Sequence, residues 1–185
     1  MIGVYGKTIP LPLSNTDAGH VDFRTITYDS EHQLFTESST FACGTAIGFV
    51  VFDCLCLFLG AVALRSAVTA EVAEEMGEAV KPVANQLTKY IKTMKSAESS
   101  KTEVAGAVFG VVSTIYSGSC LGAALSTFLG SLTWYNSVLY GATALGTIMA
   151  AVATDGAAEI GLLVIEIATA GWVISDSIKA DEACA

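Results

Sequence analysis

The stretch from Val104 to Thr154 contains 51 residues and not one Asp, Glu, Lys, Arg or His. A single helix of that length would be about 75 Å long, more than twice the hydrocarbon thickness of a bilayer. We therefore expect two membrane helices, 104–130 and 137–154, that are joined by a turn in the polar and aromatic residues between them.

The first of these two helices carries a small residue at nearly every fourth position. Residues four apart lie above one another on a helix, so this pattern predicts a groove that another backbone can approach closely. A glycine inside a helix costs about 1 kcal/mol in water relative to alanine, whereas helix association in lipid depends on such close contact. The expected packing positions are Gly106, Gly110, Gly118, Gly122, Ser126 and Gly130, together with a second pair at Gly44 and Gly48.

The composition also favours a membrane environment. Hydrophobic residues make up 52% of the 185-residue chain, charged residues only 15%, and the mean hydropathy is +0.58. The formal net charge of -9 provides no basic patch to neutralise phosphates, so nucleic acid is not an expected partner. Membrane lipid and other membrane protein subunits are the expected partners.

Two further apolar segments complete the predicted all-α membrane protein of about four transmembrane helices. Residues 41–64 are long enough to cross a bilayer and contain a single charged residue, Asp53. Residues 157–176 are of marginal length and are interrupted by Glu166. An ionisable group inside a membrane segment is a candidate for a proton, ion or polar contact, and we expect no cation at membrane depth to pair with either carboxylate.

Three segments are expected to lie outside the bilayer. Residues 1–40 form a polar N-terminal arm with weak alternation, which predicts extended structure and a short β-ribbon. Residues 66–102 repeat apolar side chains every three or four positions, which predicts a long amphipathic helix with a kink at Pro82. Residues 177–185 form a short acidic tail.

The distribution of positive charge predicts the orientation. The connector 65–103 holds six of the nine Lys and Arg residues, so it should face the cytoplasm, the matrix or the stroma. An even number of crossings then places both termini on the opposite side of the membrane.

No pattern for catalysis, metal binding or a cofactor is evident. The five cysteines are odd in number and most lie in or beside apolar runs, so we expect small buried side chains and no disulfide framework. Cys54 and Cys56 are two positions apart on a helix and point away from each other, which argues against a metal site with Asp53. The two histidines, His20 and His32, lie in the N-terminal arm. The apolar segments contain no histidine that could serve as an axial haem ligand.

Three functions are compatible with these features. The first is a structural or accessory subunit of a larger membrane complex, for example an energy-transducing one. The second is a homo-oligomeric pore, because a small-residue stripe suits packing between identical helices. The third is a soluble pore-forming toxin or effector that hides an apolar helical hairpin, although one amphipathic helix is too little to cover four apolar segments. An enzyme is the least supported class.

Overall fold

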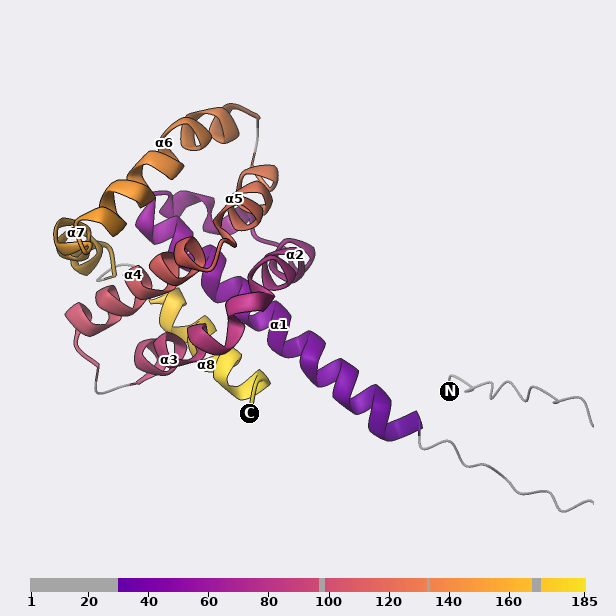
Figure 1. Cartoon of the computed structure of the whole chain (residues 1–185). Helices are drawn as coiled ribbons and strands as arrows, with labels where there is room; N and C mark the ends of the chain where they lie inside the picture. The colour runs from indigo at the N-terminus through magenta and orange to yellow at the C-terminus, as the bar shows by residue number, and fades with distance from the viewer. Residues whose placement is uncertain (1–29, 97–98, 133, 168–170) are drawn as a thin grey trace, which may run out of the picture.

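The computed structural model describes residues 30–96, 99–132, 134–167 and 171–185. Every regular element in these ranges is helical and none is a strand, which confirms the predicted all-α fold. Figure 1 shows α1 (Ser30–Phe58) running through the centre of a helical bundle, while its N-terminal end projects away from the other helices. Residues 30–40 therefore belong to a helix and not to an extended arm, and residues 1–29 lie outside the described part.

The remaining elements are short, and most are separated by sharp turns. In chain order they are η1 (Val62–Ala67), α2 (Ala70–Val80), η2 (Lys81–Val83), α3 (Ala84–Lys95), α4 (Lys101–Ser117), α5 (Leu121–Gly130), α6 (Trp134–Ala153), α7 (Ala157–Ile167) and α8 (Trp172–Ala183).

The first apolar segment does not continue as a helix to residue 64. α1 ends at Phe58, and Gly60 adopts a φ of +63°, a left-handed conformation that glycine reaches without steric cost. The amide of Ala61 donates a hydrogen bond of 2.7 Å to the carbonyl of Cys56, which closes the helix end. The chain then turns back, and η1 lies against α1.

The amphipathic connector is two helices and not one. The Thr69 side chain accepts a hydrogen bond of 3.3 Å from the Val72 amide and caps α2. Pro82 lies in the single turn of 3-10 helix that separates α2 from α3, where its missing amide is tolerated. Most of the predicted apolar face is buried, namely Met76, Val80, Val83, Leu87, Ile91 and Met94.

The predicted helix 104–130 is broken in the middle. The structure places α4 and α5 at 112° to each other. The break lies at Gly118–Cys120, where Ser119 has a φ of +60°. At the other end of α4, Ser100 and Glu103 form a capping box, with the Glu103 carboxylate 2.7 Å from the Ser100 amide.

The last two predicted spans also differ from the structure. α6 covers the expected helix 137–154, and α7 follows it at an angle of 116°. The turn uses Gly156 at a φ of +66°, and a Cβ there would lie 2.5 Å from the Phe109 ring. The expected span 157–176 comprises α7 and the start of α8, and the expected acidic tail is helical as far as Ala183.

The core of the bundle surrounds the second half of α1. Each of residues 50–57 has an exposed fraction of 1% or less, so this part of the helix is covered on all sides. The Phe52 ring lies 5.0 Å from the Phe128 ring of α5, and the Phe58 ring lies 6.4 Å from the Phe109 ring of α4. α2, α4, α7 and α8 also contact α1.

One helix of the described chain is long and apolar enough to cross a membrane, namely Phe41–Phe58 of α1. The number rises to three if each of the two bent pairs, α4 with α5 and α6 with α7, is counted as one span.

Candidate functional site

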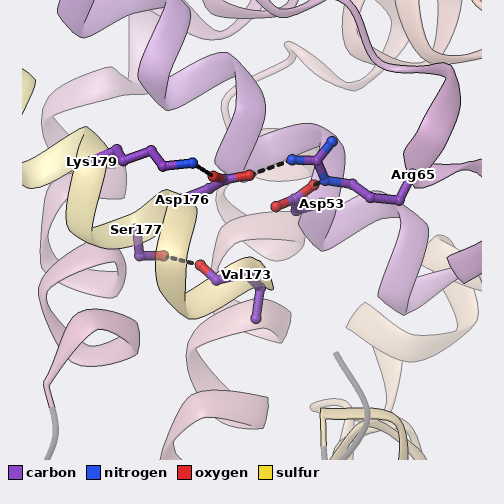
Figure 2. A network of polar contacts seen from close by, with 6 residues as sticks. All are labelled: Asp53, Arg65, Val173, Asp176, Ser177 and Lys179. Atoms are coloured by element: carbon purple, nitrogen blue, oxygen red, sulfur yellow. Dashed lines mark hydrogen bonds and ion pairs between the residues drawn. The ribbon is translucent and has the colours of Figure 1, made fainter. Parts of the chain in front are cut away.

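A network of charged side chains fastens α8 and η1 to the middle of α1 (Figure 2). Asp53 comes from α1, Arg65 from η1, and Asp176 and Lys179 from α8. The Arg65 guanidinium lies between the two carboxylates, with its Nε 2.5 Å from Asp53 Oδ1 and a terminal nitrogen donating to Asp176 Oδ2. One arginine thus connects three elements.

Both acidic side chains of the network are buried. The Asp53 side chain has an exposed fraction of 0% and that of Asp176 has 6%, whereas Arg65 is 26% exposed. A carboxylate in such surroundings is strongly destabilising unless a cation compensates it. Arg65 provides that cation, so the expectation that Asp53 has no cationic partner is wrong.

Asp176 is held by two cations. Lys179 Nζ donates a hydrogen bond of 2.7 Å to Asp176 Oδ1, while Arg65 donates to the other oxygen. Burial alone would raise the pKa of Asp176, but the hydrogen bonds from Lys179 and Arg65 outweigh burial and keep this pKa below its usual value. The neighbouring Ser177 hydroxyl donates a hydrogen bond of 2.7 Å to the Val173 carbonyl within α8, so this buried hydroxyl has a hydrogen-bond partner.

Two aromatic rings complete the surroundings of Arg65. Its guanidinium carbon lies 5.7 Å from the centre of the Phe49 ring on α1 and 5.7 Å from the centre of the Trp172 ring on α8. Cation–π attraction at this distance adds to the ion pairs and fixes the direction of the guanidinium.

A disulfide and a further ion pair fasten the other end of α8. Cys43 of α1 is bonded to Cys184, directly after α8, and Lys95 of α3 pairs with Asp181 of α8. The sequence analysis expected no disulfide framework and did not identify this single bond between Cys43 and Cys184. Cys54, Cys56 and Cys120 are free and buried, as expected.

The structure does not bring Asp53 and Glu166 together as a pair. Glu166 lies on α7, where it lines a cavity of about 220 Å³ with Glu159, Leu57 and Phe58. The two carboxylates that the sequence singles out thus occupy different surroundings.

The glycines of the expected packing stripe divide into two groups. A Cβ at Gly48 would lie 1.8 Å from the Ala73 carbonyl oxygen, and a Cβ at Gly77 would lie 2.2 Å from the Gly44 carbonyl oxygen, so α1 and α2 touch through their backbones. Gly110 and Gly118 face the side chains of Tyr90 and Val83. Nothing lies within 4 Å of a Cβ at the remaining glycines of the stripe, Gly106, Gly122 and Gly130, and Ser126 is exposed.

Sequence reasoning missed Arg65, Asp176 and Lys179 as site residues. Arg65 was counted only among the positive charges of the connector 65–103, and the other two were assigned to the edge of a span and to a tail. Within this network, the spacing of Asp176 and Lys179, three residues apart on one helix, is the local pattern that indicates an ion pair.

The network is suited to holding helices together, and its chemistry is electrostatic. Among the described residues there is no group of three or more His, Cys, Asp or Glu side chains that could hold a metal ion. Comparison of the chain with known protein families, with curated proteins and with solved structures finds no match.

Proposed function

We propose that this chain is a membrane-active protein without enzymatic activity, which folds in water as a helical bundle and transfers α1 into a lipid bilayer. Of the functions weighed from the sequence, this is the soluble pore-forming toxin or effector. The observation that carries the proposal is the position of α1: within its apolar stretch Phe41–Phe58, residues 50–57 are buried among the other helices of the bundle.

The packing of α2 on α1 argues against the alternative that α1 spans a bilayer in the arrangement seen here. The contacts of Gly44 and Gly48 with α2 lie within the apolar stretch, so α2 is at the same depth. Its outer face exposes four carboxylates, and each charged side chain at the centre of a membrane costs about 3 kcal/mol. These exposed residues are Glu71, Glu74, Glu75 and Glu78.

The earlier objection, that one amphipathic helix cannot cover four apolar segments, does not apply to this fold. The second and fourth apolar segments are broken into short helices: α4 packs on α1, α5 and α7, and α5 packs on α2. α2 and α8 then cover further sides of α1, and α3 covers a side of α4.

The bonds that hold α8 in place are consistent with an α1 that is kept buried until it is released. α8 covers α1, and both the charge network and the Cys43–Cys184 bond hold it in place. A disulfide between distant residues is typical of proteins in oxidising compartments, which supports a secreted or lumenal location for this form.

The test compares the protein in buffer and on vesicles. We expect the purified chain to be a compact monomer without detergent. After reduction and incubation with vesicles, we expect it to resist alkaline carbonate extraction, and protease treatment should leave a membrane-protected fragment that contains residues 41–58. A chain that dissolves only in detergent, together with foreign subunits, would instead support the accessory membrane subunit.

The accessory subunit is the second candidate, because α6 and α7 expose apolar side chains. Leu162 is 65% exposed and Ile165 is 70% exposed in the isolated chain. Such a surface is compatible with a neighbouring protein as well as with lipid.

A further inference from the structure

Large apolar side chains are exposed mainly on two neighbouring helices. In the part of the chain that the structure describes, six large hydrophobic residues are strongly exposed, and four of them lie on α6 and α7. These four are Leu145, Met149, Leu162 and Ile165. Figure 1 shows α6 and α7 together on the side of the bundle away from the projecting end of α1 and from α8.

The exposed sides of both helices are free of charge. From residue 143 to residue 153, every exposed residue of α6 is an apolar residue, a threonine or a glycine. On α7 the exposed residues are Ala157, Ala158, Gly161, Leu162 and Ile165, while Glu159 and Glu166 are only partly exposed and line the cavity beside α1. We call these exposed residues of α6 and α7 the α6–α7 face.

The geometry points to the α6–α7 face as a docking surface for the interface of a lipid bilayer. Protein interfaces are centred on aromatic and arginine side chains, which are absent from the described exposed residues of this face. Aliphatic side chains among small residues, with no charged side chain within the face itself, instead match the acyl boundary of a membrane.

Charge selects the class of lipid. The charged residues of α7 and of the turn before it are all acidic, namely Asp155, Glu159 and Glu166. The sequence contains no Lys or Arg between Lys101 and Lys179. A surface bordered by carboxylates, on a chain with a net charge of -9, is repelled by anionic headgroups. The expected ligand is therefore a zwitterionic surface such as phosphatidylcholine.

This inference rests on the proposed function, since it identifies the surface that first meets the membrane. It requires no movement of α1, however, because the face is exposed while the disulfide is closed. Docking and insertion are therefore separable in one experiment.

The test measures co-flotation of the full, oxidised chain with phosphatidylcholine vesicles and with vesicles that contain phosphatidylserine. We expect binding to the neutral vesicles and weaker binding to the anionic ones at low salt. The variant L162E/I165E should lose affinity by at least about tenfold, because two side chains no longer enter the interface. The matched control is I178E, which changes an apolar side chain on α8 that is 41% exposed and lies outside the face.

The outcomes decide the inference in either direction. Unchanged helical circular dichroism in both variants, with loss of flotation only in L162E/I165E, supports it. Absence of wild-type binding to neutral vesicles, equal binding of L162E/I165E, or an equal loss in I178E overturns it. If the wild type floats but remains extractable by alkaline carbonate after reduction, docking stands and the proposed insertion of α1 fails.

Discussion

Arg65 Nε lies 2.5 Å from Asp53 Oδ1, although the chain reverses direction between these two residues. The reversal at Gly60 turns η1 back along α1 and brings the guanidinium to a carboxylate that is fully buried. Asp176 then approaches the same guanidinium from α8. Burying the Asp53 carboxylate would be unfavourable on α1 alone. Through Arg65, the same carboxylate instead helps to connect α1, η1 and α8.

Replacing Arg65 with glutamine should destabilise the fold strongly. Two carboxylates would remain in the core with one cation fewer, and breaking a buried ion pair in this way costs about 3–5 kcal/mol. Urea denaturation followed by circular dichroism measures the loss. Lys179→Gln is the control, because the Lys179 side chain is 68% exposed and its ion pair should contribute no more than about 1 kcal/mol.

The double variant R65Q/D53N separates charge from packing. If the uncompensated charge of Asp53 causes most of the loss, then removing that charge should restore part of the free energy of unfolding. No recovery in the double variant would show that the charge of Asp53 is not the source of the loss, which then lies in the ion pair with Asp176 or in the contacts with Phe49 and Trp172.

Asp176 should make the fold sensitive to acid. Its folded-state pKa lies below its usual value of 3.8, so its contribution to stability is complete above that pH and is lost as the pH falls through the folded-state value. Denaturation at a series of acidic pH values should show this loss in the wild type. The variant D176N should show a flatter dependence over the same range, and an identical slope would contradict the assignment.

Replacing two glycines with different surroundings by alanine should change the stability of the protein in opposite directions. Gly48→Ala places a methyl group 1.8 Å from a backbone oxygen of α2, so the helices must separate, at a cost of about 1–3 kcal/mol or more. Gly106→Ala meets nothing within 4 Å inside α4 and should stabilise the protein by up to about 1 kcal/mol. The urea midpoints of the two variants, compared with the wild type, test both directions.

The disulfide predicts a thiol count and a change in stability. In denaturant, the oxidised chain should present three reactive thiols and the reduced chain all five. Reduction should lower the free energy of unfolding by about 2–5 kcal/mol, because the bond closes a long loop in the unfolded chain. The variant C43S/C184S should already have the lower stability and should not respond to reductant. A response in that variant would mean that another bond is involved.

Local patterns predicted local structure well. The repeat of Met76, Val80, Leu87 and Ile91 indicated the buried face of the connector, because helical periodicity is a property of neighbouring residues. The all-α class followed from the same kind of evidence. Helix ends were less predictable, since Ser119 and Gly60 leave the helix through turns that the hydrophobic pattern does not mark.

Contacts between distant residues were beyond the sequence. Nothing near Cys43 indicates Cys184, and nothing near Asp53 indicates Asp176, because both pairs depend on where α8 lies in space. Hydrophobicity also failed to identify the surroundings of α1. An apolar helix has the same sequence pattern whether its neighbours are acyl chains or the side chains of other helices.

The bond between Cys43 and Cys184 joins positions 141 residues apart, so almost all of the described chain is one covalent ring. A protease that cuts a single loop anywhere between α2 and α7 therefore linearises the ring without releasing a fragment. The nicked molecule would migrate as one species on a non-reducing gel and as two on a reducing gel. The two fragments of the cleaved protein can therefore separate only after the disulfide is reduced.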